Sequence, residues 1–300
     1  MKPKEWALFA ALGLIWGSSF LWIKIAIQEL DAFTLVGWRL LFGTLGMVAV
    51  IALRRPAFPR SRSIWLALIA LGVINTALPF VLISWGEKSI DSAVASVLNS
   101  TVPLFTLVLA HFALHDEPIS ARKAAGLLIG FGGIVVLMAR DFQPGVLRAG
   151  ALGQLAVLLA ALSYASASVF ARRTMREVPP LVQAFIPMAI ADVLVWTLAT
   201  QVGDPGRLPA LPLTWVALVW LGMLGSCVAY LLFYQLLHSV GATRTTMVTY
   251  VFPIVGVTLG VLFLDELADW HLLAGAALVV ASLAVVNWRP KAAVEPAAAD

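Results

Sequence analysis

The sequence predicts an all-α integral membrane protein with ten transmembrane helices, arranged as two inverted five-helix repeats. Only 12% of its 300 residues are charged and 61% are hydrophobic, whereas a soluble domain carries about 25% charged residues. The apolar residues come in runs of about 20, the length that crosses a hydrocarbon core of about 30 Å. The motifs of the first half also recur about 150 residues later in the same order. Together these observations exclude a soluble fold and a protein with a single membrane anchor.

Ten apolar runs are separated by short connections rich in turn-forming residues. The first run is expected to be a retained helix and not a signal peptide, because it reaches spanning length and no small-residue cleavage site follows it. Ser120 and Asp269 stand where they would N-cap the fifth and tenth spans. The predicted spans are residues 6–27, 32–53, 64–86, 92–114, 121–139, 151–171, 180–200, 213–237, 242–263 and 271–288.

The positive charges give the orientation. With the N-terminus inside, fourteen Lys and Arg residues fall on the cytoplasmic side and five fall outside, as the positive-inside rule requires. Both termini are therefore expected in the cytoplasm, and an Ala- and Pro-rich tail over residues 290–300 is expected to be disordered. The inside residues are Lys2, Lys4, Arg54, Arg55, Arg60, Arg62, Arg122, Lys123, Arg172, Arg173, Arg176, Arg244, Arg289 and Lys291.

An internal duplication divides the chain into residues 1–142 and 143–289. Residues 85–103 correspond to residues 235–253 at an offset of 150, with a proline at the same depth in each. Each half contains five spans, so the second half must enter the membrane from the opposite side. Inverted repeats of this kind place a substrate site near the midplane between the halves, and they suit alternating access.

The first span carries the sequence Trp-Gly-Ser-Ser-Phe over residues 16–20, followed by Lys24. This segment resembles the opening signature of the EamA family of the drug/metabolite transporter superfamily. The Trp38-Arg39 pair, Pro103 and Pro253 are similar to family features, as are the Asp-Glu pairs before spans five and ten. The resemblance covers residues 6–288.

The resemblance implies a basket of ten helices in a bacterial inner membrane. Spans one, three, four, six, eight and nine would line a central cavity, and spans five and ten would pack at its side. The most similar group is the amino-acid exporters of the YddG type, which implies export. The second half departs from the signature, because Tyr164 replaces the tryptophan and Ser163 and Ser166 flank it. Roles in span one are therefore not transferred to span six.

Span four has one polar face, because Ser92, Ser96, Asn99 and Pro103 follow one another at steps of four, three and four. Thr246, Thr249 and Pro253 form the equivalent face of span nine. Lipid offers no hydrogen bonds, so both faces should point inward. Each proline also frees a carbonyl one turn earlier, which would suit an ammonium or amide donor. The alternative is that these residues only join helices by hydrogen bonds.

Spans one, three, six and eight add aromatic and amide groups to this chamber, as is typical of small-molecule sites. For each aromatic residue the alternative is ordinary packing or a place in the interfacial belt. The predicted substrate-binding residues are Trp16, Ser19, Asn75, Pro79, Ser96, Asn99, Pro103, Tyr164, Tyr230, Tyr234, Thr246, Thr249, Tyr250 and Pro253.

The predicted midplane of the lining spans contains no Lys or Arg for a sugar phosphate. It also contains no buried acid for a proton pump. Arg39 and Asp192 lie in spans two and seven, outside the lining, and Arg39 is expected to snorkel toward the membrane surface in a structural role. We therefore expect a carrier of small neutral or zwitterionic metabolites, with amino acids favoured, including aromatic and hydrophobic ones.

Two other functions remain open. A multidrug exporter of aromatic cations would need an acid in the cavity, and Asp192 is the candidate. An intramembrane lipid-modifying enzyme would have to use His111, His115 and Asp116. No enzymatic activity, cofactor, metal or nucleic-acid partner is expected, and Cys227, the single cysteine, permits no intrachain disulfide. The expected partners are a small-molecule substrate and the lipid bilayer, with the protein acting as a monomer.

Overall fold

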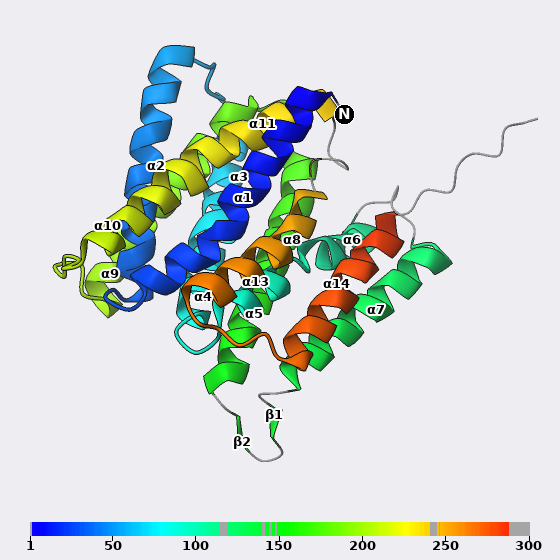
Figure 1. Cartoon of the computed structure of the whole chain (residues 1–300). Coiled ribbons are helices and arrows are strands. Elements are labelled where there is room, and N and C mark those ends of the chain that lie inside the picture. The colour runs from blue at the N-terminus through cyan, green and yellow to red at the C-terminus, as the bar shows by residue number, and fades with distance from the viewer. Residues whose placement is uncertain are drawn as a thin grey trace, which may run out of the picture.

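The computed structural model describes residues 2–113, 119–139, 142–143, 146–147, 149–240, 245 and 247–287 (Figure 1). Within these residues the protein is helical, apart from a short antiparallel hairpin. In this hairpin β1 (Phe142–Gln143) pairs with β2 (Val146–Leu147), with Phe142 opposite Leu147. The prediction of an all-α membrane protein is therefore confirmed for the described part of the chain.

Eight helical segments are long and apolar enough to cross a membrane. Two further apolar segments are shorter, so the multi-pass character is confirmed while the tenfold crossing stays a prediction. The eight are α1 (Pro3–Ala26), α2 (Ala32–Arg54), α3 to α4 (Arg62–Gly86), α5 to α6 (Ser92–Ala113), α7 (Ala121–Met138), α8 (Ala149–Thr174), α9 (Pro180–Val202) and Pro212–Phe233 in α10 to α11; the shorter two are Met247–Phe263 and Trp270–Val286.

Four of these segments are interrupted in matching pairs. The third contains a π-helix, η1 (Val73–Ala77), between α3 (Arg62–Gly72) and α4 (Leu78–Gly86). The eighth contains another, η2 (Trp220–Val228), between α10 (Pro212–Val219) and α11 (Ala229–Val240). Because π-turns displace backbone carbonyls from the regular ladder, they often mark functional sites.

The fourth and ninth segments break next to Pro103 and Pro253. α5 (Ser92–Asn99) ends just before α6 (Val102–Ala113), and a 3₁₀ turn, η3 (Met247–Tyr250), precedes α13 (Val251–Phe263). Proline has no N–H and cannot continue the ladder at these points. In the fourth segment the hydroxyls of Ser100 and Thr101 donate to carbonyls one turn earlier, each at 2.6 Å. These side chains satisfy acceptors near the break.

Small residues let the helices approach closely. A Cβ added to Gly17 of α1 would lie 2.7 Å from the Val255 side chain of α13. α7 and α14 (Trp270–Asn287) pack along each other at one side of the bundle (Figure 1), where a Cβ on Gly133 would lie 3.0 Å from the Gly275 carbonyl. The resemblance implied this side position for the fifth and tenth spans. Ser120 and Asp269 cap α7 and α14 as predicted, since each accepts a hydrogen bond from a first-turn N–H.

The outer surface of the bundle is apolar. Leu128 on α7 is 76% exposed and Val193 on α9 is 71% exposed. Many other large hydrophobic residues are exposed on the remaining helices. Patches of this extent mark a surface that is covered by lipid or by another protein. The buried core lies between the helices and extends from α1 to α14.

Candidate functional site

Five of the predicted site residues meet in the interior around a residue that was not predicted to belong there, Arg39. The Trp16 and Tyr230 rings are edge to face, with centroids 6.1 Å apart. Tyr164 lies near both Tyr230 and Arg39, and Tyr230 reaches the side chains of Asn75 and Thr76. Ser19 Oγ and Arg39 Nη2 lie 3.4 and 3.9 Å from the position that a Cβ on Gly225 would take. We call this group the central cluster; it comprises Trp16, Ser19, Arg39, Asn75, Tyr164, Ser226 and Tyr230.

Trp16 is fixed by contacts from the second half of the chain. Its indole Nε1 donates a hydrogen bond to the Gly225 carbonyl in η2 at 3.0 Å. Its ring also lies 5.7 Å from Phe233 and 6.3 Å from Phe252, measured between centroids. Aromatic rings at such distances and tilts attract one another beyond their buried area. Trp16 is therefore a rigid wall of the cluster and not part of an interfacial belt.

The two halves exchange hydrogen bonds at their π-helices. Trp16, on the first helix of one half, donates to Gly225 in η2 of the other. In return, the Ser163 hydroxyl on α8, the first helix of the second half, donates to the Ile74 carbonyl in η1 at 2.6 Å. A carbonyl that leaves the α-helical ladder is free to accept such a bond. The irregular segments are thus the places where the halves contact each other through polar groups.

Arg39 points into the bundle, so the expectation that it snorkels to the membrane surface was wrong. The residue is 5% exposed, and its guanidinium carbon lies 3.8 Å from the centroid of the Phe80 ring. Its Nε donates to the Ser226 hydroxyl in η2 at 3.3 Å. The resemblance places α2 outside the lining, yet α2 contributes this cation to the interior of the bundle.

Asp192 lies elsewhere. It is 7% exposed on α9, beside Thr44 of α2 and Trp196 on its own helix. It therefore faces the packing interface between α2 and α9 and not the central cluster. An acid facing the cavity would have favoured an exporter of aromatic cations, and Asp192 does not face the cluster.

The remaining predicted residues are distributed around the cluster. Ser96 is buried against Gly256 of α13, and the Tyr250 hydroxyl donates to the Leu283 carbonyl of α14 at 2.5 Å, so both join helices. Asn99 is 8% exposed, and its Oδ1 has no hydrogen-bond partner among the described residues. Pro79 and Pro253 are buried, and Pro103 and Thr249 are half-buried.

Two of the predicted site residues lie wholly or partly outside the described part of the chain. Thr246 lies outside the described residues, and Tyr234 is described only as part of the α11 backbone. His115 and Asp116, considered for a lipid-modifying enzyme, also lie outside them, while His111 is exposed on α6.

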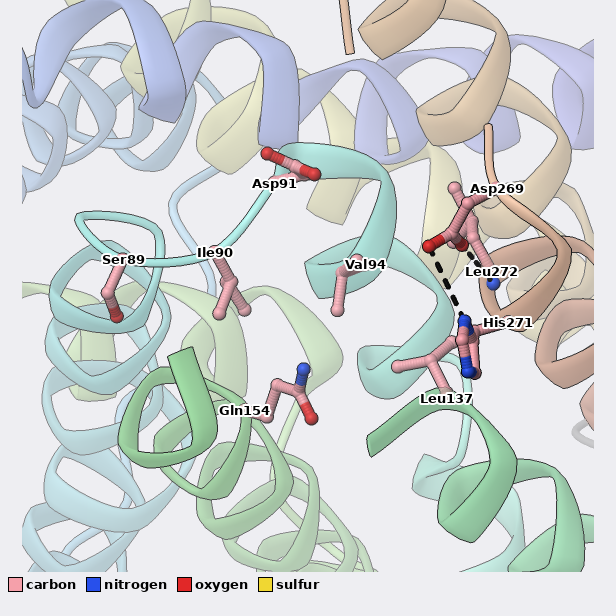
Figure 2. A pocket seen from close by; sticks show the side chains of 9 residues that line it. All are labelled: Ser89, Ile90, Asp91, Val94, Leu137, Gln154, Asp269, His271 and Leu272. Atoms are coloured by element: carbon pink, nitrogen blue, oxygen red, sulfur yellow. Dashed lines mark hydrogen bonds and ion pairs between the residues drawn. The ribbon is translucent and has the colours of Figure 1, made fainter. Parts of the chain in front are cut away.

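Two small cavities lie beyond the cluster, at the ends of the helices that were predicted to face outside. Figure 2 shows the first, of about 130 Å³, between the α4–α5 connection, α8 and the start of α14. There His271 Nδ1 lies 3.5 Å from Asp269 Oδ2. The second, of about 290 Å³, is lined by Lys24, Gln28, Asp91, Leu264, Asp265, Glu266 and Leu267.

Lys24 and Glu266 hold the loops around the second cavity. Lys24 Nζ donates to the carbonyls of Glu87 and Ile90 at 2.7 and 2.6 Å. The Glu266 carboxylate accepts from the backbone N–H groups of Ser92 and Ala93 at 2.7 and 2.9 Å. A carboxylate is favoured at this helix N-terminus by both the free N–H groups and the helix dipole. The sequence identified Lys24 and the Asp-Glu pair as motifs, and the structure shows that Lys24 and Glu266 anchor the α4–α5 connection.

Glu87, directly after the third span, is fully buried between these groups. Among the described residues no donor bonds either oxygen of its carboxyl. Burial raises the pKa of Glu87 well above its ordinary value; the negative charge of Glu266 adds to the rise, while Lys24 and Arg39 oppose it.

This raised pKa predicts a pH-dependent stability. A carboxyl whose pKa is higher in the folded state contributes its full stability below its unfolded value, and that contribution is lost as the pH rises through the folded pKa. Glu87→Gln, which is neutral at every pH, should therefore unfold at a higher temperature than the wild type at pH 8 and at a similar temperature at pH 4.5. Thermal unfolding in detergent measures both. The control is Asp265→Asn, which changes an exposed acid nearby. An equal shift at both pH values for Glu87→Gln would contradict the prediction.

Comparison with known proteins finds one family. The model of the EamA-like transporter family matches residues 4–139 and again residues 151–288. The uncharacterized inner membrane transporter YedA of Escherichia coli K12 is 29% identical over 265 residues, 87% of this chain and 82% of the relative. The uncharacterized transporter YoaV of Bacillus subtilis is 23% identical over 271 residues, 89% and 90% of the two chains. A solved crystal structure at 21% identity superposes with a TM-score of 0.66 over 95% of this chain and 98% of the other, which supports the fold.

Proposed function

The chain belongs to the EamA-like transporter family, and on this premise we propose that it is an alternating-access carrier of small neutral or zwitterionic metabolites, chiefly amino acids. Membrane transport follows from the family. The substrate class and the transport cycle are the proposal. The observation that carries it is the central cluster, where polar and aromatic side chains from both halves meet in the interior of an otherwise apolar bundle.

Several features support a pair of inverted repeats. The family model matches the chain twice. η1 and η2 interrupt corresponding segments, as do the breaks at Pro103 and Pro253. The hydrogen bonds from Trp16 to η2 and from Ser163 to η1 are also reciprocal. Rocking one half against the other would exchange these contacts and open the cluster alternately to each side.

The chemistry of the cluster favours amino acids with apolar or aromatic side chains. Trp16, Tyr164 and Tyr230 offer ring surfaces, and Asn75 and Ser226 offer hydrogen-bonding groups. An apolar wall with a few placed polar groups is typical of a small-molecule site. No acid of the described residues belongs to the cluster, so a cationic drug gains no counter-charge there.

The charge bias and the resemblance support a location and a direction for the carrier. The excess of Lys and Arg in the connections predicted to be inside supports cytoplasmic termini. YedA is named an inner membrane transporter, which supports the same membrane for this chain. Export is the direction that the resemblance to amino-acid exporters favours.

Counterflow in proteoliposomes tests the proposal. Vesicles loaded with an unlabelled solute should accumulate the same labelled solute for hydrophobic and aromatic amino acids. Purine bases and cationic drugs are the other members of the panel. Counterflow of cationic drugs alone would favour the multidrug alternative, and no counterflow with any solute would contradict the proposal.

A further inference from the structure

Arg39 is a buried charge that the described structure leaves without a counter-charge. It lies within α2, is 5% exposed, and has no carboxylate of the described residues within 4.0 Å. Glu87 acts on it only at longer range. Charged side chains inside a membrane bundle are costly and rarely remain unless they pair or serve a function.

The guanidinium is held so that its outer edge is free. The Phe80 ring lies against its plane, and Nε is used by the Ser226 hydroxyl. The Nη groups make no hydrogen bond to the described residues. A planar guanidinium with fixed orientation and available N–H groups is preorganised for an anion that can accept two parallel bonds.

The surroundings select among anions. A phosphate dianion would call for more than one cation, and Arg39 is the only Lys or Arg that belongs to the cluster. A carboxylate carries a single negative charge, which one guanidinium balances, and its two oxygens fit the guanidinium fork. Tyr164 and Tyr230 lie beside Arg39 and would contact the rest of the solute, and Asn75 is an acceptor near enough to Tyr230 to receive an ammonium group.

We propose that Arg39 binds the carboxylate of the transported solute, so that the carrier selects monocarboxylates and rejects their amides. This inference rests on the proposed function. It makes Arg39 a specificity-determining residue, in place of the structural role expected from the sequence.

The test compares matched solutes with and without the carboxylate. Phenylalanine and phenylalaninamide, and leucine and leucinamide, are used as competitors for counterflow of the labelled amino acid in proteoliposomes. The wild type should be inhibited by the acids at concentrations about ten- to a hundredfold lower than by the amides, since hydrogen bonds to a charged group are strong. In Arg39→Gln this preference should disappear, through weaker binding of the acids and unchanged binding of the amides. Arg39→Lys should keep part of it.

The control is Arg207→Gln, which removes an exposed loop cation and should keep the full preference. If Arg39→Gln weakens the binding of acids and amides equally, Arg39 only joins α2 to η2. The inference then fails, while the carrier proposal stands. If Arg39→Gln does not fold, the test uses the rise in unfolding temperature that acid and amide each produce in the wild type and in Arg39→Lys. Equal stabilisation by acid and amide in the wild type overturns the inference. A wild type that neither transports nor binds either solute contradicts the carrier proposal itself.

Discussion

Tyr230→Ala is expected to reduce counterflow at least about tenfold while the protein still folds. The ring closes the central cluster against Trp16, with centroids 6.1 Å apart, and its hydroxyl reaches Asn75 and Thr76. An edge-to-face aromatic contact and a hydroxyl hydrogen bond each contribute about 1 kcal/mol, and together they correspond to a loss of one to two orders of magnitude. Because Tyr230 is half-buried, truncation opens space at the cluster and removes little of the core.

Initial counterflow rates, with the elution profile in detergent as a check on folding, measure this effect. Tyr230→Phe keeps the ring and should retain more activity than the alanine variant, which separates the ring from the hydroxyl. Trp6→Ala removes a 57% exposed aromatic residue near the start of α1 and serves as the control. If Tyr230→Ala and Asn99→Ala both kept full activity, the assignment of the site would be refuted.

Gly17→Leu is expected to prevent stable folding. Gly17 is buried where α1 crosses α13, and even a single added Cβ would lie 2.7 Å from the Val255 side chain. Overpacking a close helix contact costs about 1–3 kcal/mol for small additions, and a leucine here must also separate two backbones. The variant should therefore unfold at a temperature at least about 10 °C below that of the wild type, or fail to yield monodisperse protein.

The chain offers a matched control for this variant. Gly132 is a glycine on α7 where an added Cβ meets nothing within 4 Å, so Gly132→Leu should unfold close to the wild-type temperature. Val255→Ala in the Gly17→Leu background should recover part of the loss, because it removes the atoms that clash. Equal stability of Gly17→Leu and Gly132→Leu would contradict the close packing of α1 against α13.

The helices themselves could be predicted from the sequence, because each depends on local information. Apolar runs of spanning length and turn residues between them located the segments, and Ser120 and Asp269 were recognised as caps from their position alone. The membrane excludes irregular backbone in these segments, since unpaired backbone groups cannot face lipid. This is why boundaries predicted from hydropathy lie within a few residues of those observed.

The site was predicted only in part, because it depends on side-chain directions that no local pattern fixes. α2 is apolar on every face, so its sequence does not reveal that Arg39 points inward; the direction is set by Phe80 and Ser226, which are distant in sequence. Glu266 likewise caps a helix that begins 174 residues earlier. An arginine within a spanning helix, as Arg39 is, itself indicates a functional residue. The sequence analysis instead assigned Arg39 a structural role.

The central claim is that two homologous halves enter the membrane in opposite directions. The most direct test is labelling of Arg60→Cys and Arg207→Cys in a Cys227→Ala background, which removes the only native cysteine. Both positions are exposed, Arg60 before α3 and Arg207 before α10. In intact cells a membrane-impermeant maleimide should label Arg207→Cys, and it should label Arg60→Cys only after the membrane is permeabilised. Labelling of both from the same side would contradict the inverted arrangement and the carrier mechanism built on it.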